Sequence, residues 1–93
     1  MATLVEIRKF EKKLNTLDDS NDYDTRVTFQ TGLQLLGAKE TELAKWAKVN
    51  RSSAGRWKRG EAAPSPSKRG LVIRFLQKMI EQEKETRTLA ARS

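Results

Sequence analysis

The most chemically distinctive side chains of this 93-residue chain are the lysines and arginines between residues 45 and 69. Eight cations lie in this segment against one carboxylate, that of Glu61, and serines lie between them. Guanidinium and ammonium groups bind phosphate, and an arginine also donates two hydrogen bonds to O6 and N7 of guanine. The segment therefore predicts a surface that binds a polyanion with readable edges, such as duplex DNA.

The positive charge lies almost wholly in the second part of the chain. The net charge is +7, to which residues 1–38 contribute −1 and residues 39–93 contribute +8. A patch of this kind predicts salt-dependent binding to nucleic acid or to an anionic membrane. No apolar run approaches the ~18 residues of a membrane span, and the N-terminal residues lack the pattern of a secretion signal. We therefore expect a cytoplasmic, nucleoid-associated protein that binds no membrane.

The composition excludes several kinds of catalytic site. The chain contains no cysteine and no histidine, so thiol chemistry, disulfides, most zinc sites and the usual general base are all absent. Residues 18–24 contain carboxylates at spacings that could bind calcium, but they lack the glycine and the final glutamate of a calcium loop, so a polar linker is the stronger interpretation. We expect no enzyme, no metal, no cofactor and no small-molecule substrate.

Two short helices are predicted to position the basic residues. Buried-type residues recur at helical spacing on both sides of a break near Val49, and those where two backbones would cross are small: Leu43, Ala44, Ala47, Ala54 and Trp57. This is the outline of a helix-turn-helix. The first helix is expected over residues 39–47, capped by Lys39 or, if shorter, by Thr41. The second is expected from about Arg51 to Lys58, with Asn50 as its N-cap and Gly60 at its end.

Three further helices complete the predicted fold, which is all-α and compact with about five helices. An amphipathic helix over residues 3–17 begins with a capping box of Thr3 and Glu6. A helix over residues 25–36 stops at Gly37, and its Gly32 suits a close helix crossing. A long helix opens at Ser65-Pro66 and reaches about Glu85.

These helices divide the chain into three predicted parts. Residues 1–24 form the N-terminal helix and an acidic linker, residues 25–85 form the helix-turn-helix domain, and residues 86–93 form a disordered tail. The apolar stripe of the N-terminal helix requires a cover, which is either the core of the same chain or a second subunit.

A family resemblance rests on Leu43-Ala44, Val49, Arg51-Ser52-Ser53 and Arg56-Trp57-Lys58-Arg59-Gly60, followed by Pro64. These residues resemble the signature of the Cro/repressor type of phage and bacterial helix-turn-helix proteins, over roughly residues 29–66. The run from Arg56 to Arg59 is also similar to the lysogeny-establishing activators of lambda-like phages. Lys48 stands where the family usually has glycine, and Ala54 stands where it usually has a β-branched residue, so that Trp46 or Trp57 is expected to fill the remaining volume. The resemblance implies a sequence-specific regulator of transcription, such as a repressor.

Site residues follow from this resemblance and from the geometry of a helix in the major groove, whose N-terminal outward residues face base edges while its flanks meet phosphates. The expected base-reading residues are Arg51, Ser52, Ser53, Gly55 and Arg56. The expected phosphate contacts are Lys39, Lys45, Lys48, Asn50, Lys58, Arg59, Lys68 and Arg69. Glu40 falls where relatives often have a phosphate-contacting glutamine, and it is assigned no contact because phosphate repels its carboxylate.

One recognition helix reads only a few base pairs, so we expect a homodimer on two half-sites about one helical turn apart. An alternative is an antitoxin-like module that binds a protein partner through its N-terminal helix and acidic loop and binds DNA only for autoregulation. A third is architectural binding with equal affinity for all duplexes.

Overall fold

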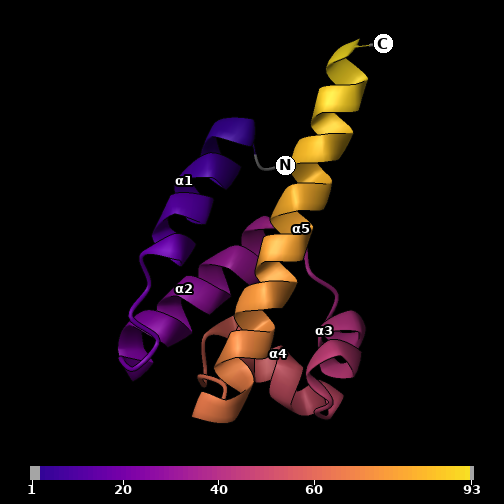
Figure 1. Ribbon diagram of the computed structural model, residues 1–93. Coiled ribbons are helices and arrows are strands. Elements are labelled where there is room, and N and C mark those ends of the chain that lie inside the picture. Colours follow the sequence, from indigo (N-terminus) through magenta and orange to yellow (C-terminus); the bar gives the residue numbers. More distant parts are fainter. Residues whose placement is uncertain (1–2, 93) are drawn as a thin grey trace.

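The computed structural model describes the backbone of residues 3–92 and the side chains of residues 3–87. Over these residues the chain forms five helices and no strand, which confirms the predicted all-α class with a long C-terminal helix: α1 (Leu4–Asn15), α2 (Asp22–Leu35), α3 (Glu40–Ala47), α4 (Arg51–Arg59) and α5 (Pro66–Arg92) (Figure 1). None of these helices, as far as they are described, is long and apolar enough to cross a membrane.

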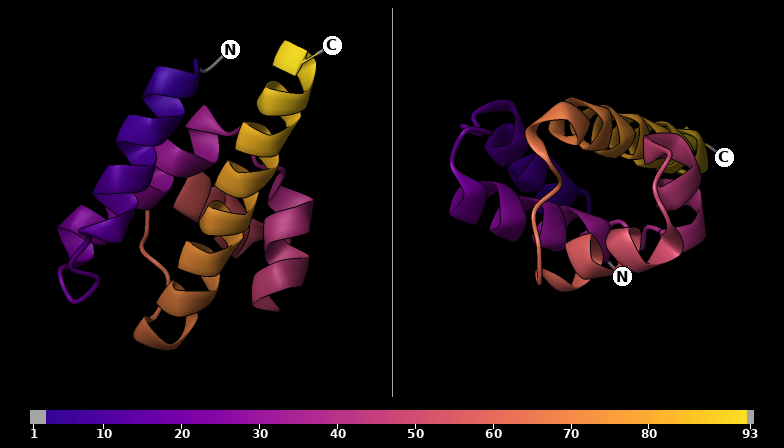
Figure 2. Two further views of the ribbon diagram at one scale, coloured as in Figure 1. Left: turned by 45° about the horizontal axis from the view of Figure 1, so that its top comes forward. Right: turned by 90° about the horizontal axis from the view of Figure 1, so that it is seen from below.

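The long helix α5 organises the packing. It contacts α1, α2 and α3, whereas α4 packs against α2 and α3 instead. Seen from below, α4 consequently lies on the opposite side of the molecule from α5 (Figure 2, right). The beginning of α1 and the end of α5 lie at the same end of the molecule, far from α4 (Figure 1). This arrangement leaves one side of α4 facing solvent.

The helix α1 covers the core of its own chain. Its predicted capping box is present, since the Thr3 hydroxyl accepts from the Glu6 N–H and the Glu6 carboxylate accepts from the Thr3 N–H. Its apolar stripe of Ile7, Phe10 and Leu14 is buried within the main hydrophobic cluster. A Cβ built on Gly32 would lie 2.2 Å from the Phe10 ring, so the glycine is the residue that permits α1 and α2 to cross this closely, as predicted.

The acidic linker is shorter than predicted. The helix α2 begins at Asp22 rather than Thr25, because the Asn21 side chain accepts a hydrogen bond from the Asp24 N–H at 3.1 Å and carboxylates are favourable in a first helical turn. The Asp18 carboxylate accepts from the hydroxyl and the N–H of Ser20, which lowers the pKa of Asp18. Within the part of the chain that is described, no three potential metal ligands of the His, Cys, Asp or Glu type gather at one point.

Arg69 ties the acidic linker to the beginning of α5. Its side chain is buried, its Nε donates to the Pro64 carbonyl at 3.0 Å, and its terminal nitrogens meet the Asp19 carbonyl and the Asp22 carboxylate. These internal partners do not favour the expected contact of Arg69 with phosphate. A guanidinium with these internal partners would have to give them up and leave the core in order to reach a ligand.

The end of α5 also differs from the prediction. The helix begins at Pro66, as predicted, but it continues past Glu85 to Arg92. The described backbone of residues 86–92 is therefore helical where a disordered tail was expected, and Ser93 lies outside the described residues. Good helix formers dominate these last turns, and Glu83 pairs with Arg87 at 3.4 Å one turn later.

Candidate nucleic-acid interface

The turn between α3 and α4 is built on a left-handed residue. Lys48 ends α3 with φ 57° and ψ 48°, and the Val49 N–H bonds to the Ala44 carbonyl at 3.0 Å. Glycine adopts this conformation at the lowest cost, and a lysine adopts it with some strain. The chain therefore makes a left-handed turn at Lys48 although this residue is not glycine. The cap of α3 is Lys39, without a side-chain hydrogen bond, and not Thr41.

Both ends of α4 are closed by the residues expected from the sequence. The Asn50 side chain accepts from the Ser53 N–H at 2.8 Å, which confirms Asn50 as the N-cap. The helix ends at Gly60, whose φ is 75°, and the Glu61 N–H bonds back to the Arg56 carbonyl at 2.9 Å. The cap uses the side-chain oxygen of Asn50, which is an acceptor, so the amide nitrogen, the donor group of this side chain, is left for a phosphate.

Two glutamines of α2, which the sequence analysis missed, hold the C-terminal end of α4. The amide nitrogen of Gln34 donates to the Lys58 carbonyl at 2.9 Å, and that of Gln30 donates to the Arg59 carbonyl at 3.0 Å. A Cβ on Gly60 would lie 2.3 Å from Oε1 of Gln30. The available signal was the spacing of four residues between the two glutamines, which places them on one face of α2.

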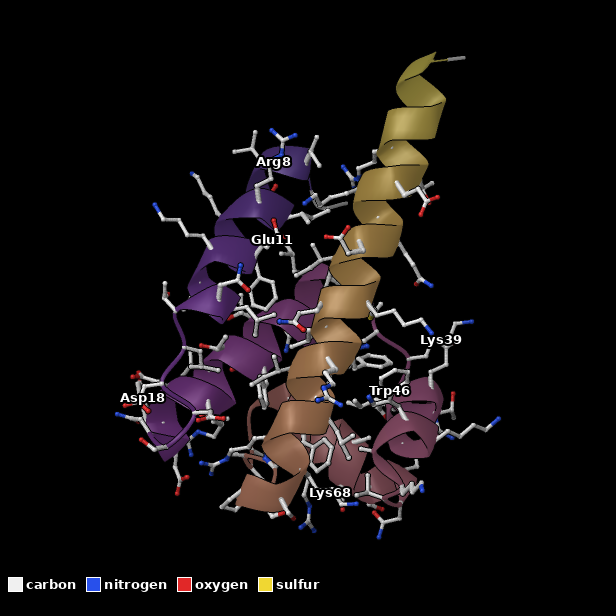
Figure 3. All side chains as sticks on the ribbon, in the orientation of Figure 1. Arg8, Glu11, Asp18, Lys39, Trp46 and Lys68 are labelled. Atoms are coloured by element: carbon white, nitrogen blue, oxygen red, sulfur yellow. The ribbon has the colours of Figure 1, made fainter. Side chains whose placement is uncertain are left out.

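The inner face of α4 belongs to the core. Ala54 and Trp57 are both buried in the main hydrophobic cluster. Trp46 instead lies between α3 and α5 (Figure 3), where its indole N–H donates to the Leu71 carbonyl at 2.8 Å and its ring meets that of Phe75 edge-on. Of the two tryptophans expected to compensate for the small Ala54, only Trp57 is therefore a buried core residue.

The outer face of α4 carries the exposed members of the predicted base-reading set. Arg51, Ser52 and Arg56 are exposed and line one shallow depression. Ser53 is half-buried and uses its N–H in the cap. Gly55 is buried, because the ends of two long side chains lie over it, so it is not available to a base edge. The depression is thus lined by four of the five predicted residues, of which Arg51, Ser52 and Arg56 are exposed and Gly55 is covered.

The side chains over Gly55 belong to Arg59 and Glu40. A Cβ on Gly55 would lie 3.0 Å from Nη1 of Arg59 and 3.2 Å from Oε2 of Glu40. The same Glu40 oxygen lies 3.7 Å from Nε of Arg51. A carboxylate that the sequence analysis left without a role therefore lies inside the basic depression, and no local sequence signal indicated this.

The predicted phosphate contacts differ in their surroundings. Lys39 and Lys48 are exposed, and Lys58 and Lys68 are half-buried. Figure 3 places Lys39 at the start of α3 and Lys68 in the first turn of α5. The remaining two have other neighbours: Lys45 lines a separate groove between α3 and α5, and Arg59 pairs with Glu61 at 3.0 Å.

Comparison with known proteins finds no match among protein-family models, curated proteins or solved structures. The chemistry of the site therefore has to be inferred from its own side chains. The exposed face of α4 offers two guanidinium groups and a hydroxyl, which are hydrogen-bond donors suited to base edges and phosphate oxygens. The rigid support behind this face comes from the core and from the two α2 glutamines.

Proposed function

We propose that this protein is a sequence-specific regulator of transcription that binds double-stranded DNA and acts as a repressor of the Cro/repressor type it resembles. The observation that carries the proposal is the division of α4 into two faces. Ala54 and Trp57 anchor one face in the core, and the other presents Arg51, Ser52 and Arg56 to solvent. A helix with this division can enter a major groove without unfolding any part of the domain.

Arg51 and Arg56 are proposed to read two bases. Five residues of helix separate them by about 7.5 Å along the axis, which is about two base-pair steps. Each guanidinium can donate two hydrogen bonds to a guanine, and Ser52 accepts or donates beside them. The bases read by the two arginines should accordingly lie about two positions apart in each half-site.

Flanking cations are proposed to hold the duplex. Lys39 precedes α3, Lys48 lies in the turn between α3 and α4, and Lys58 lies within α4. The side-chain amide of Asn50 adds a neutral donor. Each phosphate neutralised by a cation changes the slope of log affinity against log salt by about −0.9. Binding should therefore weaken steeply as salt is added, while sequence preference persists.

A homodimer is part of the proposal, because two recognition helices are needed for useful specificity. The stripe of α1 is already buried in its own core, which leaves the last turns of α5 as the proposed contact between subunits. These turns extend beyond the other helices in Figure 1. The alternative of an antitoxin-like module gains no support from α1, since the apolar residues with which it would bind a partner are the buried ones.

The test is selection of bound duplexes from a random pool, together with the mass of the protein in solution. We expect a two-fold symmetric site bound by two chains. Arg51→Ala and Arg56→Ala should each lose about tenfold in preference at one base pair per half-site. Arg8→Ala is the matched control, because Arg8 is exposed on α1 (Figure 3). The proposal fails if both α4 variants keep the wild-type sequence preference.

A further inference from the structure

The carboxylate of Glu40 is a feature of the depression beside α4 that opposes DNA binding as described so far. It lies at the first residue of α3, its side chain is 31% exposed, and its Oε2 faces Nε of Arg51. Phosphates repel a carboxylate, so a surface selected only for affinity would not place one there. A carboxylate in this position requires a function other than attraction to the backbone.

The geometry of the Arg51 side chain indicates that function. A guanidinium has five N–H donors in a fixed planar fork. Glu40 engages the Nε side at 3.7 Å, and no hydrogen bond or ion pair of the terminal nitrogens of Arg51 is found among the described residues. The two terminal nitrogens are the pair that meets O6 and N7 of a guanine end-on. Glu40 thus leaves free the part of the side chain that reads a base.

We propose that Glu40 is a specificity-determining residue that positions Arg51 for a guanine and opposes its capture by phosphate. This inference rests on the proposed DNA-binding function and deepens it. On a matching site, Arg51 keeps Glu40 on one side and gains guanine on the other. On a random site, an Arg51 side chain that turned to a phosphate would lose its ion pair with Glu40. The unpaired Glu40 carboxylate would then lie close to the negatively charged DNA backbone. Random duplexes are therefore disfavoured relative to matching ones.

Gly55 is what makes room for this arrangement. The Glu40 carboxylate and the end of Arg59 both lie over the glycine, where a methyl group would meet them at 3.2 and 3.0 Å. Arg59 is in turn held by Glu61, with Nε to Oε2 at 3.0 Å. Both arginines that lie next to Glu40 thus have a carboxylate partner on the protein, and Gly55 is used for side-chain packing rather than for approach to the groove.

The experiment compares Glu40→Gln with Glu42→Gln, the other carboxylate in the first turn of α3. Both variants lose one charge near the same helix end, but Glu42 faces the groove between α3 and α5 instead of α4. Affinity is measured over a series of salt concentrations for three duplexes: the selected site, the selected site with the Arg51 guanine replaced, and a random sequence. The melting temperature of each variant is recorded to exclude an effect of unfolding.

We expect Glu40→Gln to raise affinity for the random duplex about fivefold, to steepen its salt slope by about 0.9, and to reduce the preference for the guanine about fivefold. Glu42→Gln should leave the guanine preference as it is. In an Arg51→Ala background, Glu40→Gln should not change the preference further.

The possible outcomes separate the two proposals. A wild-type chain that does not bind DNA, or that binds all duplexes equally, overturns the proposed function and this inference with it. A wild-type chain with a clear preference, combined with a Glu40→Gln variant that has the same preference and the same salt slope, overturns the inference alone. Equal changes in both glutamine variants would also overturn it, because the effect would then be one of net charge.

Discussion

Single residues with left-handed backbone conformations form the turns before and after α4. Gly60 adopts a left-handed φ of 75°, and the Gln30 amide lies where its side chain would begin. Lys48 adopts the same backbone region with a φ of 57° although it is not a glycine. The turn before α4 therefore tolerates a side chain, whereas the turn after α4 has neither the backbone preference nor the space for one.

We predict that Gly60→Ala lowers the free energy of unfolding by about 1–3 kcal/mol, because left-handed strain adds to the displacement of Gln30. Urea denaturation measures the change. Gly70→Ala is the matched control, since Gly70 lies inside α5 with nothing within 4 Å of an added Cβ, and alanine there should stabilise the helix by about 0.5–1 kcal/mol. Equal effects of both substitutions would show that neither the left-handed strain nor the Gln30 contact contributes to stability.

At the level of helices, the features that could be predicted are those set by neighbouring residues. The capping box at Thr3, the cap at Asn50 and the helix start at Pro66 depend on residues within three or four positions, and all are confirmed. The start of α2 was placed too late, because an Asn-Asp-Tyr-Asp segment resembles a loop until Asn21 is recognised as a cap.

In the candidate site, too, the features that could be predicted are those set by neighbouring residues. Helical periodicity places Arg51, Ser52 and Arg56 on the outer face of α4, and they are exposed. The covering of Gly55, the internal pairing of Arg69 and the support from Gln34 all come from side chains distant in sequence. A periodic pattern carries no information on such contacts, so the local elements were predictable while the details of the site were not.

We predict that removing the α2 glutamines loosens the end of α4. Each amide satisfies one backbone carbonyl of the last turn, so Gln30→Ala and Gln34→Ala should each lower the free energy of unfolding by about 1 kcal/mol. Hydrogen exchange at the Gly60 and Glu61 amides should accelerate.

Gln77→Ala serves as the control for these variants, because this glutamine is exposed on α5. Unchanged exchange at both amides in the Gln30 and Gln34 variants would contradict a supporting role for the two glutamines.

On the scale of the whole molecule, one hydrophobic cluster joins all five helices. It contains Phe10 of α1 together with Phe29 of α2, Leu43 of α3, Trp57 of α4 and Leu76 of α5. Glu11 and Lys84 add an ion pair at 3.3 Å between α1 and α5. The predicted boundary at residue 24 falls inside α2, and α1 packs as part of the same core as the helix-turn-helix segment.

We predict that Phe10→Ala destabilises the entire molecule by about 3–5 kcal/mol, a large fraction of the about 5–15 kcal/mol typical of a domain. The midpoints of thermal unfolding measured by circular dichroism and by tryptophan emission should fall by the same amount, because α1 shares one core with the other four helices.

Val5→Ala, at a position of α1 that is 62% exposed, should leave the unfolding transition nearly unchanged. If Phe10→Ala melted α1 alone and left the tryptophan transition in place, the single-core description would be wrong.

The two tryptophans differ in exposure, so intrinsic fluorescence can distinguish two parts of the molecule. Trp57 is enclosed while Trp46 is 37% exposed, so acrylamide or iodide should quench Trp46 first. Replacing Trp46 with phenylalanine would leave Trp57, on the inner side of α4, as the single tryptophan. The emission maximum and fluorescence lifetime of Trp57 would then report on the packing of α4 against the core without any attached dye. Both could be followed in titrations with nucleic acid and in stopped-flow mixing.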